Sequence, residues 1–257
     1  MKWSLNTYKI GQDWELDFLI EMVKKAGYEG IEYLMDFDQK HGLEWDTPEE
    51  KWAEYKEKMA AAGLACASLC SCQNFHAPEK ESRDQSVERV KRVIDMADFL
   101  ECDHIRVLGD RFTDKNRNEV VQNVGECLGL LGAYAQPKDI TVSIEMHSSF
   151  TVPDASLEAI RIADHPNVGA VFNCVWPPGV TVENVHVFHD EIAGHITMVH
   201  THGAESPETF ELYRNLFSKL REIDFQGYVS NECAYTGTDP EKVLALYLGL
   251  FRAFAGE

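Results

Sequence analysis

Eight short apolar runs alternate with longer stretches of helical periodicity along the 257 residues of this chain. In one such stretch, Val87, Val90 and Ile94 recur at the three- and four-residue spacing of a helix with one apolar face. Regular alternation of this kind predicts repeated βαβ units and a parallel sheet. The predicted strands cover residues 3–7, 30–35, 64–71, 104–108, 141–146, 168–173, 196–201 and 228–233.

Turn-forming residues lie between these segments. Gly27, Gly63 and Gly227 precede predicted strands, and Pro48 and Pro240 stand where helices should begin. No Pro/Ser-rich linker or low-complexity segment divides the chain. Because eight pairs of strand and helix can close a barrel, we predict an α/β fold with a single (β/α)8 TIM barrel domain over residues 1–257. An open, doubly wound sheet is the alternative.

The net charge of −19 restricts the partners of the chain. Acidic residues outnumber basic ones 43 to 24, whereas nucleic-acid binding depends on Lys and Arg side chains that neutralise phosphates. We therefore expect no nucleic-acid partner, and no anionic membrane for the same reason. A small carbohydrate substrate is compatible with this charge, because the surface field is only loosely coupled to a buried site. Assembly of the chain into a homo-oligomer is also compatible with the sequence.

The first residues and the cysteines indicate a cytoplasmic location. The start, MKWSLNTYKI, lacks the apolar segment of a signal peptide, and no run approaches the roughly 18 apolar residues of a membrane span. The seven cysteines show no paired framework, so we expect no disulfides. Cys66, Cys70 and Cys72 lie close together, but no second Cys/His cluster stands at zinc-site spacing, which favours buried small residues.

Polar residues stand near the ends of the last four predicted strands, which are consecutive in the chain. These residues are Glu145, Asn173, His200 and Glu232. The carboxyl ends of parallel strands in a barrel meet at one rim, where such side chains could hold a divalent metal. Strand alternation supports an inward orientation: Val142 and Ile144 share an apolar face that should meet helices, which leaves Glu145 on the opposite face. His200 and Glu232 follow the same rule on their own strands.

In these residues and in its order of elements, the chain resembles the xylose isomerase-like barrel superfamily of sugar isomerases, sugar epimerases, inosose dehydratases and endonuclease-IV-like proteins. The resemblance rests on AGYEGIEYL as a second strand, ESRDQSVERVKRVIDMADFLECDHIRVLGD as a third helix and fourth strand, and GYVSNEC as a last strand. Metal-dependent members hold the metal with Glu, Asp, His and Glu on strands five to eight. The resemblance implies that Glu145, Asn173, His200 and Glu232 occupy these positions.

Strand six departs from the family pattern. The family commonly has Asp-x-x-His there, whereas this chain has Asn173-Cys174-Val175-Trp176. An amide oxygen can ligate a hard cation, but the loss of one negative charge should weaken the site. We expect Mn²⁺ or Mg²⁺, with Co²⁺ or Zn²⁺ as alternatives. The opposing interpretation is that metal affinity has been lost.

The resemblance implies proton abstraction next to a sugar carbonyl, through an enediolate. Glu145 and Glu232 would form the catalytic acid/base pair, because family epimerases place two glutamates on opposite faces of the substrate. The absence of an obvious Lys/Arg cluster near the rim favours an unphosphorylated sugar or keto-sugar. Two alternatives to an isomerase or epimerase stay open. One is a lyase or dehydratase on a keto-sugar, keto-glycoside or inosose; the other is a non-catalytic sugar-binding or partner subunit.

Five further residues could contact the substrate. They are His147, His202, Arg106, Trp176 and Asn6. His202 is either a second substrate contact or an alternative metal ligand, and Arg106 could equally form a structural ion pair inside the barrel. Asn6 and Glu32, near the first two strand ends, could line the pocket or satisfy local backbone groups.

Overall fold

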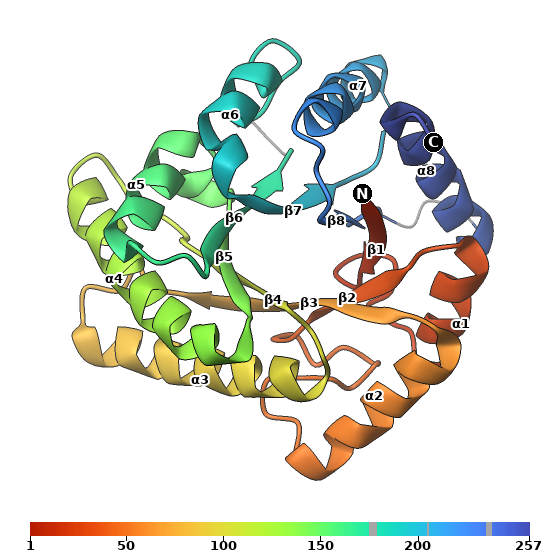
Figure 1. Cartoon of the computed structure of the whole chain (residues 1–257), viewed down its shortest axis with the longest axis horizontal. Helices are drawn as coiled ribbons and strands as arrows, with labels where there is room; N and C mark the ends of the chain where they lie inside the picture. The colour runs from red at the N-terminus through yellow and green to blue at the C-terminus, as the bar shows by residue number, and fades with distance from the viewer. Residues whose placement is uncertain (175–178, 205, 235–237) are drawn as a thin grey trace.

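The chain folds as a closed barrel of eight parallel strands in chain order, surrounded by helices (Figure 1). We describe it from a computed structural model that covers residues 1–174, 179–204, 206–234 and 238–257. The last strand pairs with the first, with Ser4 opposite Ser230. This closure confirms the predicted TIM barrel and rules out the open doubly wound sheet.

The strands and helices alternate throughout the chain. The strands are β1 (Lys2–Asn6), β2 (Gly30–Leu34), β3 (Ala65–Asn74), β4 (His104–Leu108), β5 (Thr141–Glu145), β6 (Val168–Asn173), β7 (Ile196–Thr201) and β8 (Tyr228–Asn231). The helices are α1 (Leu16–Ala26), α2 (Glu49–Ala62), α3 (Lys80–Phe99), α4 (Arg117–Ala135), α5 (Pro153–Ala163), α6 (Val185–Ile192), α7 (Pro207–Glu222) and α8 (Pro240–Ala255). Among the described residues there are also three short 3-10 turns: η1 (Gln136–Lys138), η2 (Ser148–Phe150) and η3 (Ala193–His195).

The predicted strands lie where expected, with differences at their ends. β3 runs three residues past its predicted end, because Asn74 still pairs with Leu108 of β4 after a register shift. β8 ends at Asn231, two residues before its predicted end. Within the described residues, no helix is long and apolar enough to cross a membrane.

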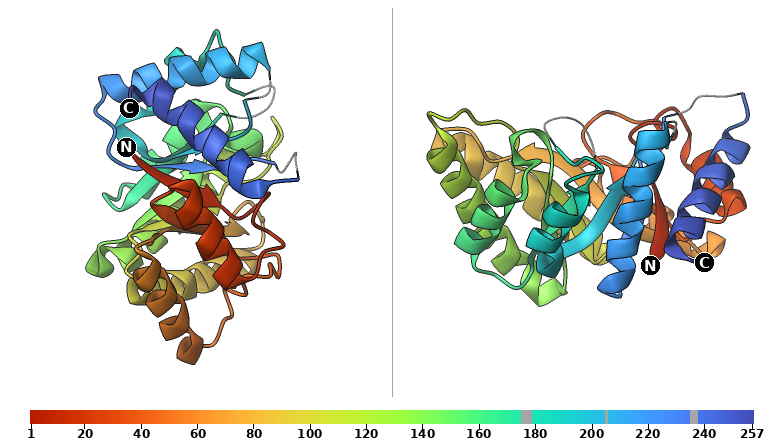
Figure 2. Two further views of the ribbon diagram at one scale, coloured as in Figure 1. Left: turned by 90° about the vertical axis from the view of Figure 1, so that its right-hand side faces the viewer. Right: turned by 90° about the horizontal axis from the view of Figure 1, so that it is seen from above.

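The main hydrophobic core lies between the barrel and its helices. Trp3 of β1 packs on Phe217 of α7, with ring centroids 5.8 Å apart, and Val142 and Ile144 of β5 are wholly buried in the same core. The helices lie around the outside of the strands in Figure 1, and Figure 2 places both termini at the same end of the barrel. Because apolar strand residues face this layer, the alternate residues must face the barrel interior.

Glycines and caps explain several helix ends. Gly27 and Gly63 follow α1 and α2 in the left-handed conformation, with φ of 89° and 71°, which a residue without Cβ adopts at low cost. Ser206 and Thr209 form a reciprocal capping box at the start of α7, and the Asp239 side chain accepts a hydrogen bond at the start of α8. The turn signals of the sequence therefore correspond to helix boundaries.

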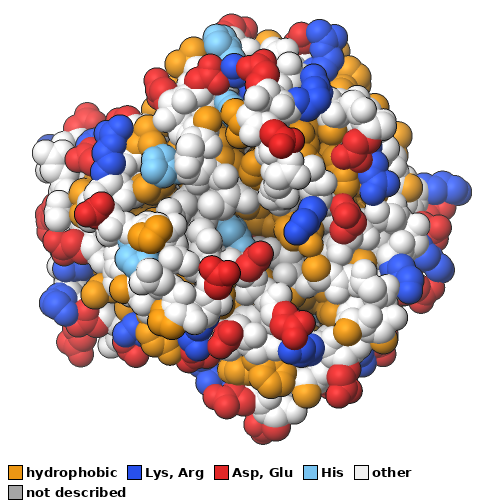
Figure 3. All heavy atoms as spheres, in the orientation of Figure 1, with side chains coloured by type: hydrophobic (Ala, Val, Ile, Leu, Met, Phe, Trp, Pro, Cys, Tyr) orange, Lys and Arg blue, Asp and Glu red, His pale blue; other side chains and the backbone are white. Residues whose placement is uncertain are grey.

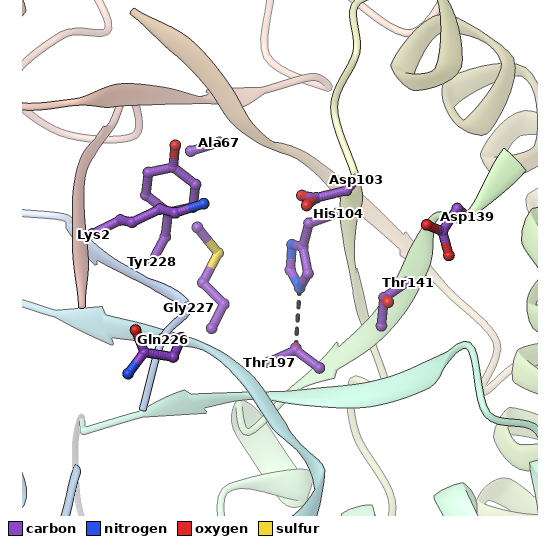
Figure 4. A pocket seen from close by; sticks show the side chains of 11 residues that line it. Lys2, Ala67, Asp103, His104, Asp139, Thr141, Thr197, Gln226, Gly227 and Tyr228 are labelled. Carbon is purple, nitrogen blue, oxygen red and sulfur yellow. Dashed lines mark hydrogen bonds between the residues drawn. The ribbon is translucent and has the colours of Figure 1, made fainter. Parts of the chain in front are cut away.

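The amino ends of the strands surround a polar pocket of about 330 Å³, opposite the predicted rim. Acidic and basic side chains are interspersed over the molecular face drawn in Figure 3. His104, at the start of β4, lines the pocket (Figure 4). Its ring nitrogens lie 2.9 Å from Ser68 Oγ and 3.1 Å from the hydroxyls of Ser143 and Thr197. Since both ring nitrogens already have partners, His104 joins four strands at the base of the barrel.

We expect His104 to make the fold sensitive to acid. Burial lowers its pKa to about 4. Because the pKa in the unfolded chain is higher, about 6.5, the unfolded chain binds more protons between these values and stability falls as the pH falls. Between pH 7 and pH 5 this linkage amounts to about 2 kcal/mol. Urea unfolding at both pH values should show a smaller loss for His104→Gln than for wild type by about that amount; equal losses would contradict the prediction.

Candidate metal centre

Three of the four predicted rim residues gather at the carboxyl ends of the strands. Glu145 ends β5, His200 lies near the end of β7, and Glu232 directly follows β8. One ligand atom from each lies within 4.8 Å of the others, and all three side chains are buried. The backbone N–H of Glu232 donates to the Thr201 carbonyl at 2.7 Å, which fixes this residue beside β7. The inward orientation predicted from strand alternation is therefore present in the structure.

Asn173 also reaches this cluster, from the end of β6. Its amide nitrogen donates a hydrogen bond of 2.5 Å to Glu145 Oε1, and its amide oxygen accepts one of 2.9 Å from His202 Nε2. The amide thus turns its nitrogen toward the carboxylates and its oxygen toward His202. In this arrangement Asn173 bridges two other site residues.

Arg106 of β4 forms a buried ion pair with Glu145. The guanidinium Nε lies 3.0 Å from Glu145 Oε2, and Nη1 donates to the Ser71 carbonyl at 2.9 Å. Burial alone would raise the pKa of the Glu145 carboxyl, but the charges of Arg106 and His200 outweigh burial and hold that pKa well below its usual range. The structure thus contains the ion pair that the sequence left as one of two options for Arg106.

His200 is surrounded by three carboxylates. Its Nδ1 lies 3.3 Å from Glu145 Oε1 and 3.5 Å from Glu232 Oε1, while its Nε2 lies 3.1 Å from both oxygens of Glu32. Burial lowers the pKa of His200, but the three carboxylates outweigh it and raise that pKa well above 6.5. Burial would raise the pKa of Glu32, yet His200 lowers it to about 2. Both members of this contact are therefore charged without a metal.

Glu32 is the site residue to which the sequence assigned no specific role. It is wholly buried on β2 and faces the interior. Its position in AGYEGIEYL, between the helix-facing residues Ile31 and Tyr33, is the signal that indicates an inward carboxylate.

Glu232 differs from Glu145 in protonation. Burial, reinforced by the nearby charge of Glu145, raises the pKa of Glu232 to about 7 despite the opposing effect of His200. Two carboxyl groups whose environments separate their pKa values are suited to acid and base roles at one site. In the metal-free protein a carboxyl that can be neutral, Glu232, therefore stands beside an ionised one, Glu145.

The other residues predicted to contact the substrate differ in how deeply they are buried. His202 follows β7 and places Nε2 3.4 Å from Glu232 Oε2; burial and the charge of His200 lower its pKa to about 3. His147 follows β5 and is exposed at the rim. Asn6 is buried, and its side chain accepts from the Tyr8 backbone N–H at 2.8 Å, which satisfies a local backbone group. Trp176 lies outside the described residues.

The donor set fits a divalent metal. Two carboxylates and one imidazole within 4.8 Å of one another suit Mn²⁺, Mg²⁺ or Zn²⁺. Two buried atoms near the cluster, Arg106 Nε and Glu32 Oε2, have no well-aligned hydrogen bond and contribute to it through charge, while Glu32 Oε1 lies within hydrogen-bond distance of His200 Nε2. Asn173 could add only a neutral oxygen, which leaves Glu145, His200 and Glu232 as the residues that would hold a metal.

A comparison with known protein families agrees with the barrel fold of the structure. The family described as xylose isomerase-like TIM barrel matches residues 20–253. A search of curated proteins gave no significant sequence match.

Solved structures with this fold include enzymes of two reaction classes. A D-psicose 3-epimerase, solved in the presence of D-fructose, is 13% identical with a TM-score of 0.80 over 100% of both chains. The IOLI protein, solved with a zinc atom, is 15% identical with a TM-score of 0.77 over 100% of this chain and 98% of that one. A probable 3-DHS dehydratase from Bacillus anthracis is 17% identical, with a TM-score of 0.71 over 98% of this chain and 99% of that one. At these identities the likeness shows the fold.

Proposed function

Because this chain belongs to the xylose isomerase-like TIM barrel family, matched over residues 20–253, we propose that it is a metal-dependent sugar isomerase or epimerase. Its substrate would be a small, unphosphorylated sugar or keto-sugar. The observation that carries the proposal is the buried cluster of Glu145, His200 and Glu232 at the carboxyl ends of the strands. The epimerase fold match and the zinc atom named for the IOLI protein support it.

The proposed chemistry is proton transfer next to a carbonyl. A divalent ion held by Glu145, His200 and Glu232 would polarise the sugar carbonyl and acidify the neighbouring C–H. The carboxylates of Glu145 and Glu232 adjoin this position and are the groups that would carry the proton. One carboxylate removes the proton and the other returns it to the opposite face of the substrate.

A lyase or dehydratase is the second candidate. The dehydratase of the same fold supports it. Removal of the proton next to the carbonyl would give an enediolate, and this enediolate can expel a hydroxyl or glycosyl oxygen from the next carbon. Within the proposal, Mn²⁺ or Mg²⁺ is the first choice of metal and Co²⁺ or Zn²⁺ the second. The proposal keeps a cytoplasmic location and one domain over residues 1–257.

The metal-stripped protein is expected to gain thermal stability on addition of Mn²⁺. Ligand that binds only the folded state stabilises it by about 2.7 kcal/mol at a concentration 100 times the Kd. Differential scanning fluorimetry across a Mn²⁺ series measures this, with EDTA reversal as the control. If neither Mn²⁺, Mg²⁺, Co²⁺ nor Zn²⁺ shifts the melting temperature, the non-catalytic binding protein becomes the better interpretation.

Incubation of the metal-loaded protein with ketoses and keto-glycosides in D₂O separates the two enzyme classes. Deuterium incorporation together with an isomeric product supports isomerisation or epimerisation. An unsaturated or dehydrated product supports elimination. A loaded protein that gives neither product and no exchange with any of these sugars counts against enzyme chemistry at this rim.

A further inference from the structure

Glu32 contacts His200 from the far side of the barrel interior. β2 and β7 are three strands apart around the barrel, so this contact crosses the lumen instead of following a strand pair. Both Glu32 oxygens lie 3.1 Å from His200 Nε2, and both side chains are wholly buried. The opposite ring nitrogen, Nδ1, faces the two candidate ligands Glu145 and Glu232.

This geometry restricts both the rotation and the tautomer of the His200 ring. A neutral imidazole carries one N–H and one lone pair, and a carboxylate can only accept. A metal bound at the cluster would displace the Nδ1 proton of the charged ring, and the Nε2–H that donates to Glu32 then leaves the Nδ1 lone pair directed toward Glu145 and Glu232. A ring rotated by 180° about its Cβ–Cγ bond would lose the Glu32 contact.

We infer that Glu32 is a positioning residue that holds His200 with Nδ1 presented to the metal. Through the imidazole, the Glu32 carboxylate also adds negative charge to the site, which the neutral amide of Asn173 does not. The inference rests on the proposed function. Carboxylate acceptors behind a histidine ligand raise its basicity, and their loss typically weakens metal binding about 10- to 100-fold. Glu32 fits this role because no other residue lies within hydrogen-bond distance of His200 Nε2 among the contacts of the described chain.

A purely structural ion pair is the competing explanation. In that case the loss of Glu32 would lower stability equally with and without metal and leave the metal affinity unchanged. Glu44 offers a matched control, because it is also a buried glutamate that accepts a backbone hydrogen bond, from Gln39 at 2.9 Å, in the loop after β2. It contacts none of the candidate ligands in the described chain.

The test compares Mn²⁺ binding to the full-length wild type, Glu32→Gln, Glu32→Asp and Glu44→Gln by isothermal titration calorimetry. We expect the Kd of Glu32→Gln to rise about 10- to 100-fold, that of Glu32→Asp to rise less, and that of Glu44→Gln to change by less than about twofold. Long-range ¹H–¹⁵N correlations of the histidine rings, recorded with diamagnetic Zn²⁺, should show the Nε2–H of His200 in wild type and an upfield shift of that proton in Glu32→Gln, because an amide oxygen accepts a weaker hydrogen bond than a carboxylate.

The outcomes separate the two hypotheses. A wild type that binds none of the tested metals overturns the proposed function and this inference together. A folded Glu32→Gln with wild-type Kd and an unchanged His200 Nε2–H shift overturns the inference and leaves the proposed function standing. If Glu32→Gln does not fold, Glu32→Asp decides instead: a Kd equal to wild type overturns the inference, and a weaker Kd supports it.

Discussion

Glu232→Gln is expected to lower kcat by about 10²- to 10⁴-fold at saturating Mn²⁺, the usual contribution of a general acid or base. Glutamine keeps the size of the side chain but cannot exchange a proton. Glu232 is buried in the candidate metal cluster, where its carboxylate would adjoin the bound substrate. Glu145→Gln should give a loss of similar size, because it removes the second carboxylate and leaves Arg106 buried without its ion-pair partner.

Steady-state kinetics on the sugar identified by deuterium exchange measure this effect. Saturating Mn²⁺ separates lost chemistry from weakened metal binding, and circular dichroism verifies the fold. Glu44→Gln, which makes the same substitution in a buried loop after β2, should retain wild-type kcat. If Glu145→Gln and Glu232→Gln both retained full activity, the assignment of the acid/base pair would be wrong.

The barrel and the orientation of its rim could be predicted because both depend on local patterns. Alternation along residues 141–147 places Val142 and Ile144 toward the helices and Glu145 inward, as observed. Strand ends were less predictable, because pairing with a neighbour decides them. β3 continues to Asn74 only because Leu108 of β4 offers a partner after a register shift.

Contacts across the lumen could not be predicted in the same way. Strand parity states that Glu32 and His200 both face inward, but not that they meet, since 168 residues separate them and the barrel radius decides which inward side chains touch. The ion pair between Arg106 and Glu145 could not be predicted either, because it depends on the conformations that two long side chains adopt inside the barrel. The orientation of the Asn173 amide depends on His202 and Glu145 together.

Asn173→Asp should have opposite effects without and with metal. In the metal-free protein, the amide N–H that donates to Glu145 Oε1 is replaced by a carboxylate oxygen, so two like charges face each other in a buried site. An uncompensated buried charge of this kind costs roughly 3–5 kcal/mol of unfolding free energy. A divalent ion between these carboxylates would compensate the charge, and we expect Mn²⁺ to bind at least about tenfold more tightly than to wild type, because ligand charge increases affinity.

Urea unfolding in EDTA and in excess Mn²⁺ tests both halves of this expectation. Asn231→Asp is the matched control: Asn231 is a buried asparagine whose side chain donates to the Tyr28 hydroxyl at 2.9 Å, on the helix-facing side of β8. Asn231→Asp should also destabilise the fold, but Mn²⁺ should stabilise it no more than it stabilises wild type. Asn173→Asp should instead show a wider gap between its metal-free and metal-loaded stabilities than wild type. An equal gap in all three proteins would mean that Asn173 does not adjoin a metal site, because only a ligand bound beside residue 173 can compensate the charge placed there.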